Sequence, residues 1–403
     1  MARPNALVDG ISSLSSPRET LEARPGEIPS RSVTVNFQGG RSGRLDMAMP
    51  RSAVWADVLD SLRQTNEPVY VEIDPETNVI TELLLPREVR VGAITPTDTG
   101  DAVEVELIIS QARHYLRRTN PDFQQLFNIL QTAQEEGIPV LVTETLDGYE
   151  IIDVKSLPKR PLERVEAPPP VSRAPAPTPV TLQKAQEIFN LLKAQTCNPT
   201  SAPPPCIPFL YPDDGCWGRA HEMCRLMLAN GVQPEKVWIY AGSVLRAATQ
   251  NNPSCEVRWG WHVAPTLLVS TGGSPEIYVI DPSLFLTPVR QTIWFDVQGD
   301  PSATLVPSDA SVFYRSRSGS VEYDPNYTQT QQVLTTYRNQ LKLRSASSVG
   351  PPPYNSCVWK VKAIAARCLS KNPPISVKRD IYVSVSPQAR TLRQQLAVIL
   401  SRC

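Results

Sequence analysis

Histidine is scarce in this sequence, and closely spaced cysteine pairs are absent. The chain has three histidines, at positions 114, 221 and 262, and none of its eight cysteines forms a Cys-x-x-Cys motif. Structural zinc sites usually draw on such motifs. Cys216, His221 and Cys224 are close in sequence, but on a helix they point in different directions, so we expect no metal site. His221 is expected to pack or cap, and His114 to lie on the surface.

Long apolar runs and excess charge are missing as well. No stretch of about 18 apolar residues occurs, which excludes a helix that spans a membrane. Met1–Gly10 lacks the apolar region of a signal peptide, so we expect no conventional signal peptide. Because 40 Lys and Arg balance 40 Asp and Glu, the composition gives no indication of a nucleic-acid partner.

Proline, by contrast, is abundant and clustered. Eight of the 40 prolines lie between Pro158 and Pro179, in a stretch without hydrophobic periodicity, which is typical of an extended, semi-rigid linker. We assign the linker to residues 156–180. The other expected parts are, in order, a disordered N-terminus at 1–31, a small α+β domain at 32–155, a second domain at 181–345 and a basic C-terminal extension at 346–403.

Local patterns predict the main elements. Ser52 and Thr181 are each expected to cap a helix, and a third helix begins after Asn120–Pro121 and ends at Gly137. The expected strands of the first domain lie at 32–37, 68–74, 79–85 and 89–94, followed by a hairpin within 138–155. In the C-terminal extension we expect a strand at 381–385 and a helix from Ser386.

Cys216 stands at the predicted start of a helix. The apolar residues after it recur at helical spacing until Asn230–Gly231, which is typical of a helix C-terminus: Ala220, Met223, Cys224, Met227 and Leu228. At a helix N-terminus, unpaired backbone N–H groups and the positive end of the dipole favour an anion. The position therefore favours a reactive thiolate at Cys216 and an oxyanion beside it.

A histidine and an aspartate follow on a predicted hairpin. His262 lies in the strand-like run Val257–Val269, Asp281 ends the run Glu276–Asp281, and a Gly-Gly loop separates the two runs. If the loop is symmetric, paired residue numbers sum to about 545, which places Asp281 on the same face as His262. A register slip of one residue would separate them. The three residues are candidates for nucleophile, base and orienting group.

Each candidate also has a structural interpretation. Cys216 could be a buried structural thiol or half of a disulfide. His262 could be a core histidine between tryptophans, and Asp281 could cap the turn at Pro282–Ser283. We favour the catalytic roles because the three residue types occur together, each in a suitable local context.

These segments resemble the bacterial protein-glutamine glutaminases, protein deamidases that convert glutamine side chains of intact proteins to glutamate. Three segments carry the resemblance: Tyr211–Met223, Trp259–His262 and Ile280–Phe285. The similarity runs from about residue 182 to about residue 341. It includes the Cys197–Cys206 loop, the run Phe313–Ser316 and Tyr323–Asp324.

The resemblance implies an α+β fold related to transglutaminases and papain-like enzymes, in which a helix that bears the cysteine packs on an antiparallel sheet that bears the histidine and aspartate. It implies Cys216 as nucleophile, His262 as general base and acid, and Asp281 as its orienter, with no cofactor or metal. It further implies a disulfide between Cys197 and Cys206, and a secreted enzyme with a pro-region. The expected partners are proteins with exposed glutamine.

Several alternatives stay open. A transglutaminase, a cysteine peptidase or a catalytically silent interaction scaffold would share much of this pattern. The aromatic residues near the candidate site either belong to the core or line a narrow cleft for a glutamine side chain: Trp217, Trp259, Trp261 and Phe285. Residues 32–155 are either an inhibitory domain that docks on the catalytic cleft or a module that selects target proteins.

Overall fold

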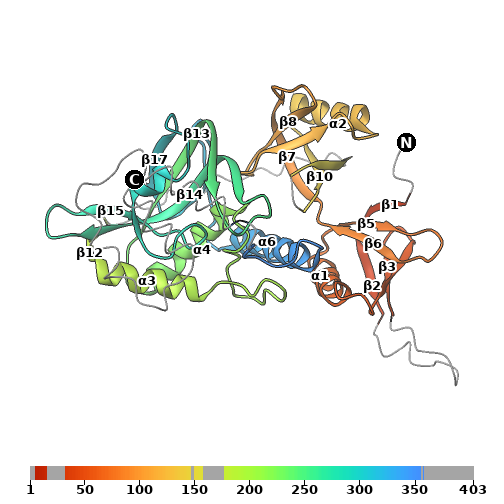
Figure 1. Ribbon diagram of the computed structural model, residues 1–403, viewed down its shortest axis with the longest axis horizontal. Coiled ribbons are helices and arrows are strands. Elements are labelled where there is room, and N and C mark those ends of the chain that lie inside the picture. The colour runs from red at the N-terminus through yellow and green to blue at the C-terminus, as the bar shows by residue number, and fades with distance from the viewer. Residues whose placement is uncertain (1–4, 16–31, 147–148, 158–176, 355–356, 358–403) are drawn as a thin grey trace, which may run out of the picture. The chain divides into compact units, whose positions relative to one another are not determined.

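The computed structural model describes residues 5–15, 32–146, 149–157, 177–354 and 357 (Figure 1). Within them the fold is mixed α/β, with six helices and several antiparallel sheets. The expected strand at 381–385 and the helix from Ser386 lie outside the described residues. No helix in the described ranges has both the length and the apolar composition needed to cross a membrane.

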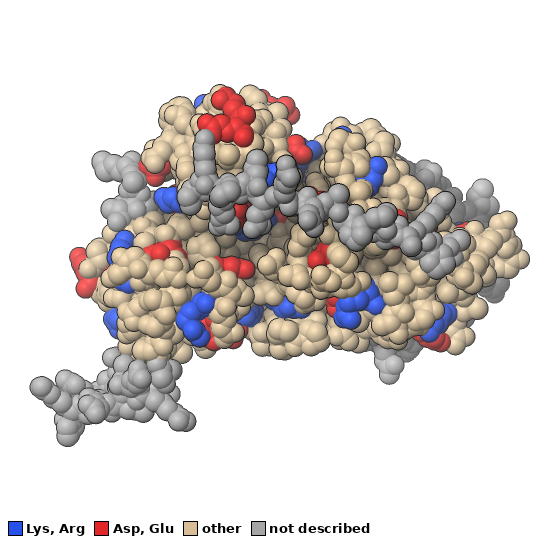
Figure 2. Space-filling model, turned by 180° about the vertical axis from the view of Figure 1, so that it is seen from behind, with Lys and Arg blue, Asp and Glu red and all other residues tan. Residues whose placement is uncertain are grey.

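The chain divides into two compact units. Unit 1 comprises Met1–Glu163, Pro199–Ala202 and Asn339–Pro351, and unit 2 comprises Arg164–Asn198, Pro203–Arg338 and Pro352–Cys403. Helix α6 (Thr328–Ala346) therefore contributes its first part to unit 2 and its last part to unit 1. On the face in Figure 2, Lys and Arg side chains lie interspersed with Asp and Glu side chains, in line with the balanced charge.

The first part of unit 1 contains two three-stranded sheets and helix α1 (Ser52–Thr65). One sheet has the order β2-β3-β4, from Ile11–Leu14, Ser32–Phe37 and Ser42–Asp46, and the other the order β1-β5-β6, from Ala6–Asp9, Val69–Ile73 and Ile80–Leu84. The buried side chains of α1 face this core: Trp55, Val58, Leu59 and Leu62.

Two expectations for this region are wrong. Within the segment 1–31, the described residues 5–15 are not disordered, because β1 pairs with β5 and β2 pairs with β3. These short strands are held by their partners' backbone groups, which a periodicity within the segment itself cannot reveal. Ser52 does not cap α1: it is the first helical residue, and its hydroxyl donates to the Asp46 carbonyl at 2.6 Å.

The second part of unit 1 is a five-stranded sheet of order β11-β10-β7-β8-β9 with helix α2 (Phe123–Glu136). Its strands are β7 (Arg87–Pro96), β8 (Ala102–Leu107), β9 (His114–Arg117), β10 (Pro139–Glu144) and β11 (Ile151–Ser156). As predicted, α2 ends at Gly137, where a φ of 64° in the left-handed region suits glycine.

Unit 2 is built on a six-stranded sheet. The strand order is β16-β15-β14-β13-β17, with β12 (Val180–Thr181) pairing in parallel with β14. The long central strands are β13 (Glu235–Ala248) and β14 (Glu256–Ser270), and the shorter ones are β15 (Glu276–Val279), β16 (Val289–Arg290) and β17 (Thr304–Asp309). A separate hairpin joins β18 (Val312–Arg315) to β19 (Val321–Tyr323).

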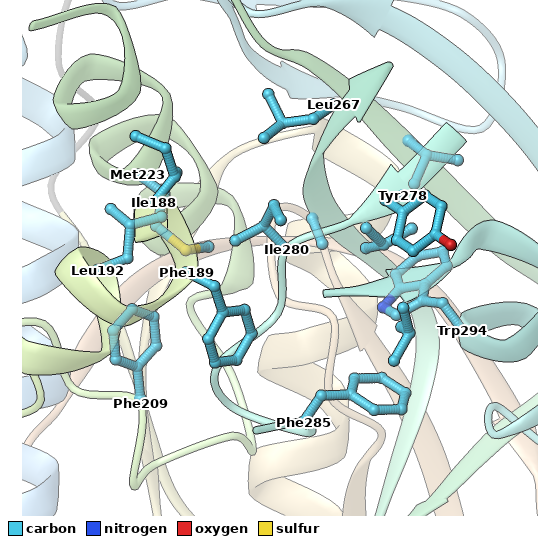
Figure 3. Packing of buried hydrophobic residues seen from close by; sticks show 14 of the residues in the cluster. Ile188, Phe189, Leu192, Phe209, Met223, Leu267, Tyr278, Ile280, Phe285 and Trp294 are labelled. Atoms are coloured by element: carbon cyan, nitrogen blue, oxygen red, sulfur yellow. The ribbon is translucent and has the colours of Figure 1, made fainter. Parts of the chain in front are cut away.

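Helices α3 (Leu182–Ala194) and α4 (Cys216–Ala229) pack on strand β14. Figure 3 shows the core of unit 2, with side chains of α3 and α4 gathered beside residues of the sheet and of the loop that follows β15. The labelled residues are Ile188, Phe189, Leu192, Phe209, Met223, Leu267, Tyr278, Ile280, Phe285 and Trp294. Burying each such large side chain contributes about 1.5–3 kcal/mol, so the sheet and both helices form a well-supported base for residues at their ends.

The starts of α3 and α4 agree with the sequence patterns. The Thr181 side chain accepts a hydrogen bond from the Lys184 N–H at 3.1 Å, which confirms the predicted cap. Helix α4 begins at Cys216, as predicted, and Gly215 before it has a φ of 79°. A Cβ at position 215 would lie 2.3 Å from the ring of Tyr337. Gly215 is therefore required both by its backbone conformation and by the close approach of Tyr337.

Candidate active site

The loop before Cys216 is fixed to the first turn of α4. Arg219 is buried, and its Nη1 donates to the carbonyls of Tyr211 at 2.9 Å and Asp214 at 2.5 Å. The Asp214 carboxylate accepts the Gly215 N–H at 2.9 Å. These bonds tie the loop before the helix to the first turn of α4, so the position of Cys216 is determined by the loop and the helix together.

Cys216 is buried, and its thiol is not part of a disulfide. Burial raises the pKa of its thiol well above the usual range, whereas the Arg219 charge and the Val263 backbone N–H, which hydrogen-bonds the thiol, lower it. The charges of Asp214 and Asp281, like burial, raise the pKa of the thiol. The expectation that the helix start alone favours a thiolate is therefore wrong, because burial outweighs the helix dipole. The resting thiol keeps its proton at neutral pH, and a thiolate requires a base close by.

His262 and Asp281 form a buried pair. The His262 Nε2 lies 2.9 Å from the Asp281 Oδ2, and both side chains are almost fully buried. Burial raises the pKa of Asp281, but the hydrogen bond and charge of His262, with smaller effects of Trp294 and Arg219, bring it below its ordinary value. Asp281 is therefore ionised at neutral pH.

The register of the hairpin brings this pair together. Thr266 pairs with Val279 and Leu267 with Tyr278, so paired numbers sum to 545, as the sequence predicts. The Ile280 N–H continues the ladder by donating to the Pro265 carbonyl at 2.9 Å. Asp281 follows directly, at the end of the hairpin nearest His262.

The second nitrogen of His262 is open. Its Nδ1 is buried and has no hydrogen-bond partner within the described part of the chain. When Asp281 accepts from Nε2, the neutral imidazole carries its proton there and offers a lone pair at Nδ1. The Val263 N–H bonds the Cys216 thiol and α4 packs on β14, so the thiol lies against the residue that follows His262. This arrangement can accept a proton from a thiol.

Part of this chain matches a known protein family, and several solved structures are similar to it. Residues 185–298 match the family described as Glutaminase. A crystal structure of pro-protein-glutaminase is 28% identical, covers 68% of this chain and 99% of its own, and has a TM-score of 0.50. The NMR structure of protein-glutaminase from Chryseobacterium proteolyticum is 35% identical over 44% of this chain and 97% of its own, with a TM-score of 0.37.

The chain belongs to the protein-glutaminase family. A search of curated protein sequences finds no match.

Two tryptophans of this chain stack on the imidazole of His262. The Trp259 and His262 rings have centroids 4.3 Å apart and planes 21° apart, and the Trp294 and His262 rings lie 5.4 Å and 25° apart. The Trp259 Nε1 donates to the Asp213 carbonyl at 2.9 Å, whereas the Trp294 Nε1 donates to the Asp281 Oδ2 at 3.0 Å. Sequence reasoning missed Trp294, because only the return of the chain through β16 and helix α5 (Gln291–Asp296) brings it to Asp281.

The four predicted aromatic residues are all buried. Trp259 and Phe285 belong to the core of unit 2. Trp217 and Trp261 lie together, with ring centroids 5.9 Å apart. The Trp217 indole N–H, next to Cys216 in sequence, is buried without an acceptor among the described residues.

Four of the cysteines in the described residues form disulfides. Cys197 pairs with Cys206, as the family resemblance implies, and Cys255 pairs with Cys357. The second pairing could not be named from the sequence, because its partners are separated by 102 residues. Cys224 is buried outside both disulfides, and burial raises the pKa of its thiol to about 11.

The other two histidines do not join the site. In unit 2, His221 accepts from the Lys236 Nζ at 2.8 Å, and burial and the Lys236 charge lower its pKa to about 3. It is therefore a neutral packing residue, as expected. In unit 1, His114 is fully buried and not on the surface. It bonds Glu144 and Ser110, and these partners were not apparent from sequence because Glu144 comes from a different strand.

Proposed function

We propose that this protein is a protein-glutamine glutaminase, which hydrolyses the side-chain amide of protein-bound glutamine to glutamate and ammonia. The observation that carries the proposal is the buried His262–Asp281 pair, which has an unbonded Nδ1 and lies on the strand whose Val263 N–H hydrogen-bonds the Cys216 thiol. Membership of the protein-glutaminase family supports the same reaction class.

In the first half of the proposed reaction, His262 takes the thiol proton at Nδ1 and the Cys216 sulfur attacks the amide carbon. The new C–S bond turns the carbonyl oxygen into an oxyanion, which backbone N–H groups at the start of α4 stabilise. His262 then gives its proton to the departing nitrogen, the C–N bond breaks, and ammonia leaves. A thioester remains on Cys216.

In the second half, water replaces ammonia. His262 removes a proton from the water, whose oxygen attacks the thioester carbon, and the proton returns to the sulfur as the C–S bond breaks. Glutamate and the free thiol result. Asp281 holds the imidazole orientation and stabilises its cationic form throughout. On this proposal the fold is related to transglutaminases and papain-like enzymes.

The test compares products. Incubation with casein and with a short glutamine peptide should release ammonia and convert the amide to an acid in the mass spectrum. A transglutaminase would instead attach an added primary amine, and a peptidase would cut the backbone. A silent scaffold would give none of these products, and this last result would overturn the proposal.

We also propose that residues 32–155 restrain the activity until the Pro-rich linker is cut. One solved relative that aligns with 68% of this chain is a pro-protein-glutaminase. The segment between Pro158 and Pro179 offers protease sites at Lys159, Arg160, Arg164 and Arg173.

Limited trypsin treatment should raise ammonia release from a small glutamine peptide, and a variant that lacks these four basic residues should not respond. If cleavage of the linker leaves the rate on small peptides unchanged, inhibition is excluded. A targeting module would then be the better interpretation, and cleavage would impair only large protein substrates.

A further inference from the structure

Trp294 contacts both members of the His262–Asp281 pair. Its indole N–H donates to the Asp281 Oδ2 at 3.0 Å, and its ring stacks on the His262 imidazole with centroids 5.4 Å apart. We propose that Trp294 is a positioning residue that fixes the Asp281 carboxylate and favours the cationic form of His262. The proposal deepens the proposed deamidase function and depends on it for its kinetic consequence.

The carboxylate of Asp281 is held at both oxygens. Oδ2 accepts from His262 and Trp294, and Oδ1 accepts from the Ser283 N–H at 3.2 Å. Without the indole donor, the carboxylate can rotate about its side-chain bond, and the His262 Nε2 loses a fixed acceptor. The tautomer with a proton on Nε2 and a lone pair on Nδ1 is then less favoured.

Stacking acts on the charge of the imidazole. When His262 takes the thiol proton it becomes a cation, and a cation over an aromatic face is stabilised most by tryptophan. Trp259 also stacks on this ring, but its N–H donates to the Asp213 carbonyl. Trp294 therefore both orients the Asp281 carboxylate and stabilises the cationic imidazole of His262.

Trp294 is placed firmly enough for this role. Its side chain is fully buried in the core of unit 2, beside Tyr278 in Figure 3. It lies in α5, directly after β16, which pairs with β15. Strand β15, which ends just before Asp281, thus also anchors, through β16, the helix that carries Trp294.

The experiment compares three variants of the full chain. Trp294→Phe keeps a ring but removes the N–H donor, and Trp294→Leu removes both. Trp238→Phe is the matched control, because Trp238 is equally buried in unit 2 and its Nε1 donates to the Ser308 hydroxyl at 2.8 Å and not to Asp281. The readouts are kcat and KM on a glutamine peptide, and the NMR signals of selectively labelled histidine.

The NMR readout needs no activity. With three histidines in the chain, the signal of His262 is assigned by its loss in His262→Gln. We expect the parent to hold the Nε2–H tautomer, and both Trp294 variants to show a mixture of tautomers and a shifted His262 titration. Trp238→Phe should retain the parent signal.

For kcat we expect a fall of about tenfold in Trp294→Phe and about a hundredfold in Trp294→Leu, with KM little changed. If Trp294→Leu fails to fold, Trp294→Phe decides. The inference is overturned if Trp294→Phe leaves the tautomer and titration of His262 as in the parent, or lowers kcat no more than Trp238→Phe. A parent that releases no ammonia would refute the proposed function, while the NMR result would still decide the role of Trp294.

Discussion

Each unit of this protein buries one histidine against a carboxylate, and the two pairs differ in what surrounds them. In unit 1, both nitrogens of His114 have partners, Glu144 at Nδ1 and the Ser110 hydroxyl at Nε2, 2.8 Å away. In unit 2, His262 bonds Asp281 through Nε2, and its Nδ1 has no partner in the described residues. The first network is closed and the second is open at one nitrogen.

The carboxylates differ in the same way. Arg87 forms a salt bridge to Glu144, so a cation holds this acid in addition to the bond from His114. Asp281 instead has Trp294 as its second side-chain donor, which fixes the carboxylate without a second ion pair. A histidine and an acid alone therefore do not make a reactive site. A pair can act as a base only where a ring nitrogen is left without a hydrogen bond.

The largest effect is expected at Cys216, the proposed nucleophile. Cys216→Ala should reduce ammonia release by at least about a thousandfold while the protein stays folded, because the covalent step is lost. Cys224→Ala is the matched control, as Cys224 is a second buried thiol on α4, and it should retain activity. Residual activity of Cys216→Ala within about tenfold of the parent would contradict the assignment.

Exchanging the two histidines for glutamine should separate activity from stability. His262→Gln should lower kcat by at least about a hundredfold. His114→Gln should leave ammonia release from a small peptide within about twofold and destabilise unit 1 by about 1–3 kcal/mol, since buried partners lose their bonds. Urea unfolding and ammonia assays on both variants check this. An active-site defect in His114→Gln would remove the contrast between the pairs.

Asp281→Asn should cost less activity than His262→Ala. The amide keeps the size of the carboxylate but not its charge, so the base remains while its orientation and its cationic form are weakened. The comparison requires kcat for both variants on one peptide. The reverse order would mean that the roles of base and orienter are wrongly assigned.

The stability of the fold should depend on pH through the His114–Glu144 pair of unit 1. Although burial opposes ionisation of Glu144, the charges of His114 and Arg87 prevail and lower its pKa from 4.5 to about 2. Because the folded-state pKa is depressed, the stabilisation is present above about pH 4.5 and is lost as the pH falls toward 2.

Glu144→Gln should therefore be less stable than the parent by a few kcal/mol at pH 7, with a smaller difference at pH 3. Urea unfolding of both proteins at the two pH values measures this difference. An equal difference at both would show that the carboxylate charge does not stabilise the fold.

The sequence by itself determined the features that depend on neighbouring residues. The start of α4 at Cys216, the Thr181 cap and the hairpin register that brings Asp281 to His262 all follow from spacing, turn residues and alternation within short segments. Such signals are local because backbone hydrogen bonds of helices and tight hairpins join residues close in the chain. The candidate nucleophile, base and acid were therefore accessible without a structure.

Only the tertiary structure decided the features that join distant segments. The burial of His114 depends on Glu144 from another strand, and Cys255 finds Cys357 across 102 residues. Trp294 reaches Asp281 only because β16 returns along β15 and starts α5 beside the hairpin. Side chains of this kind carry no periodic signal. Their roles arise when packing removes water and leaves each polar atom to find, or to lack, a partner.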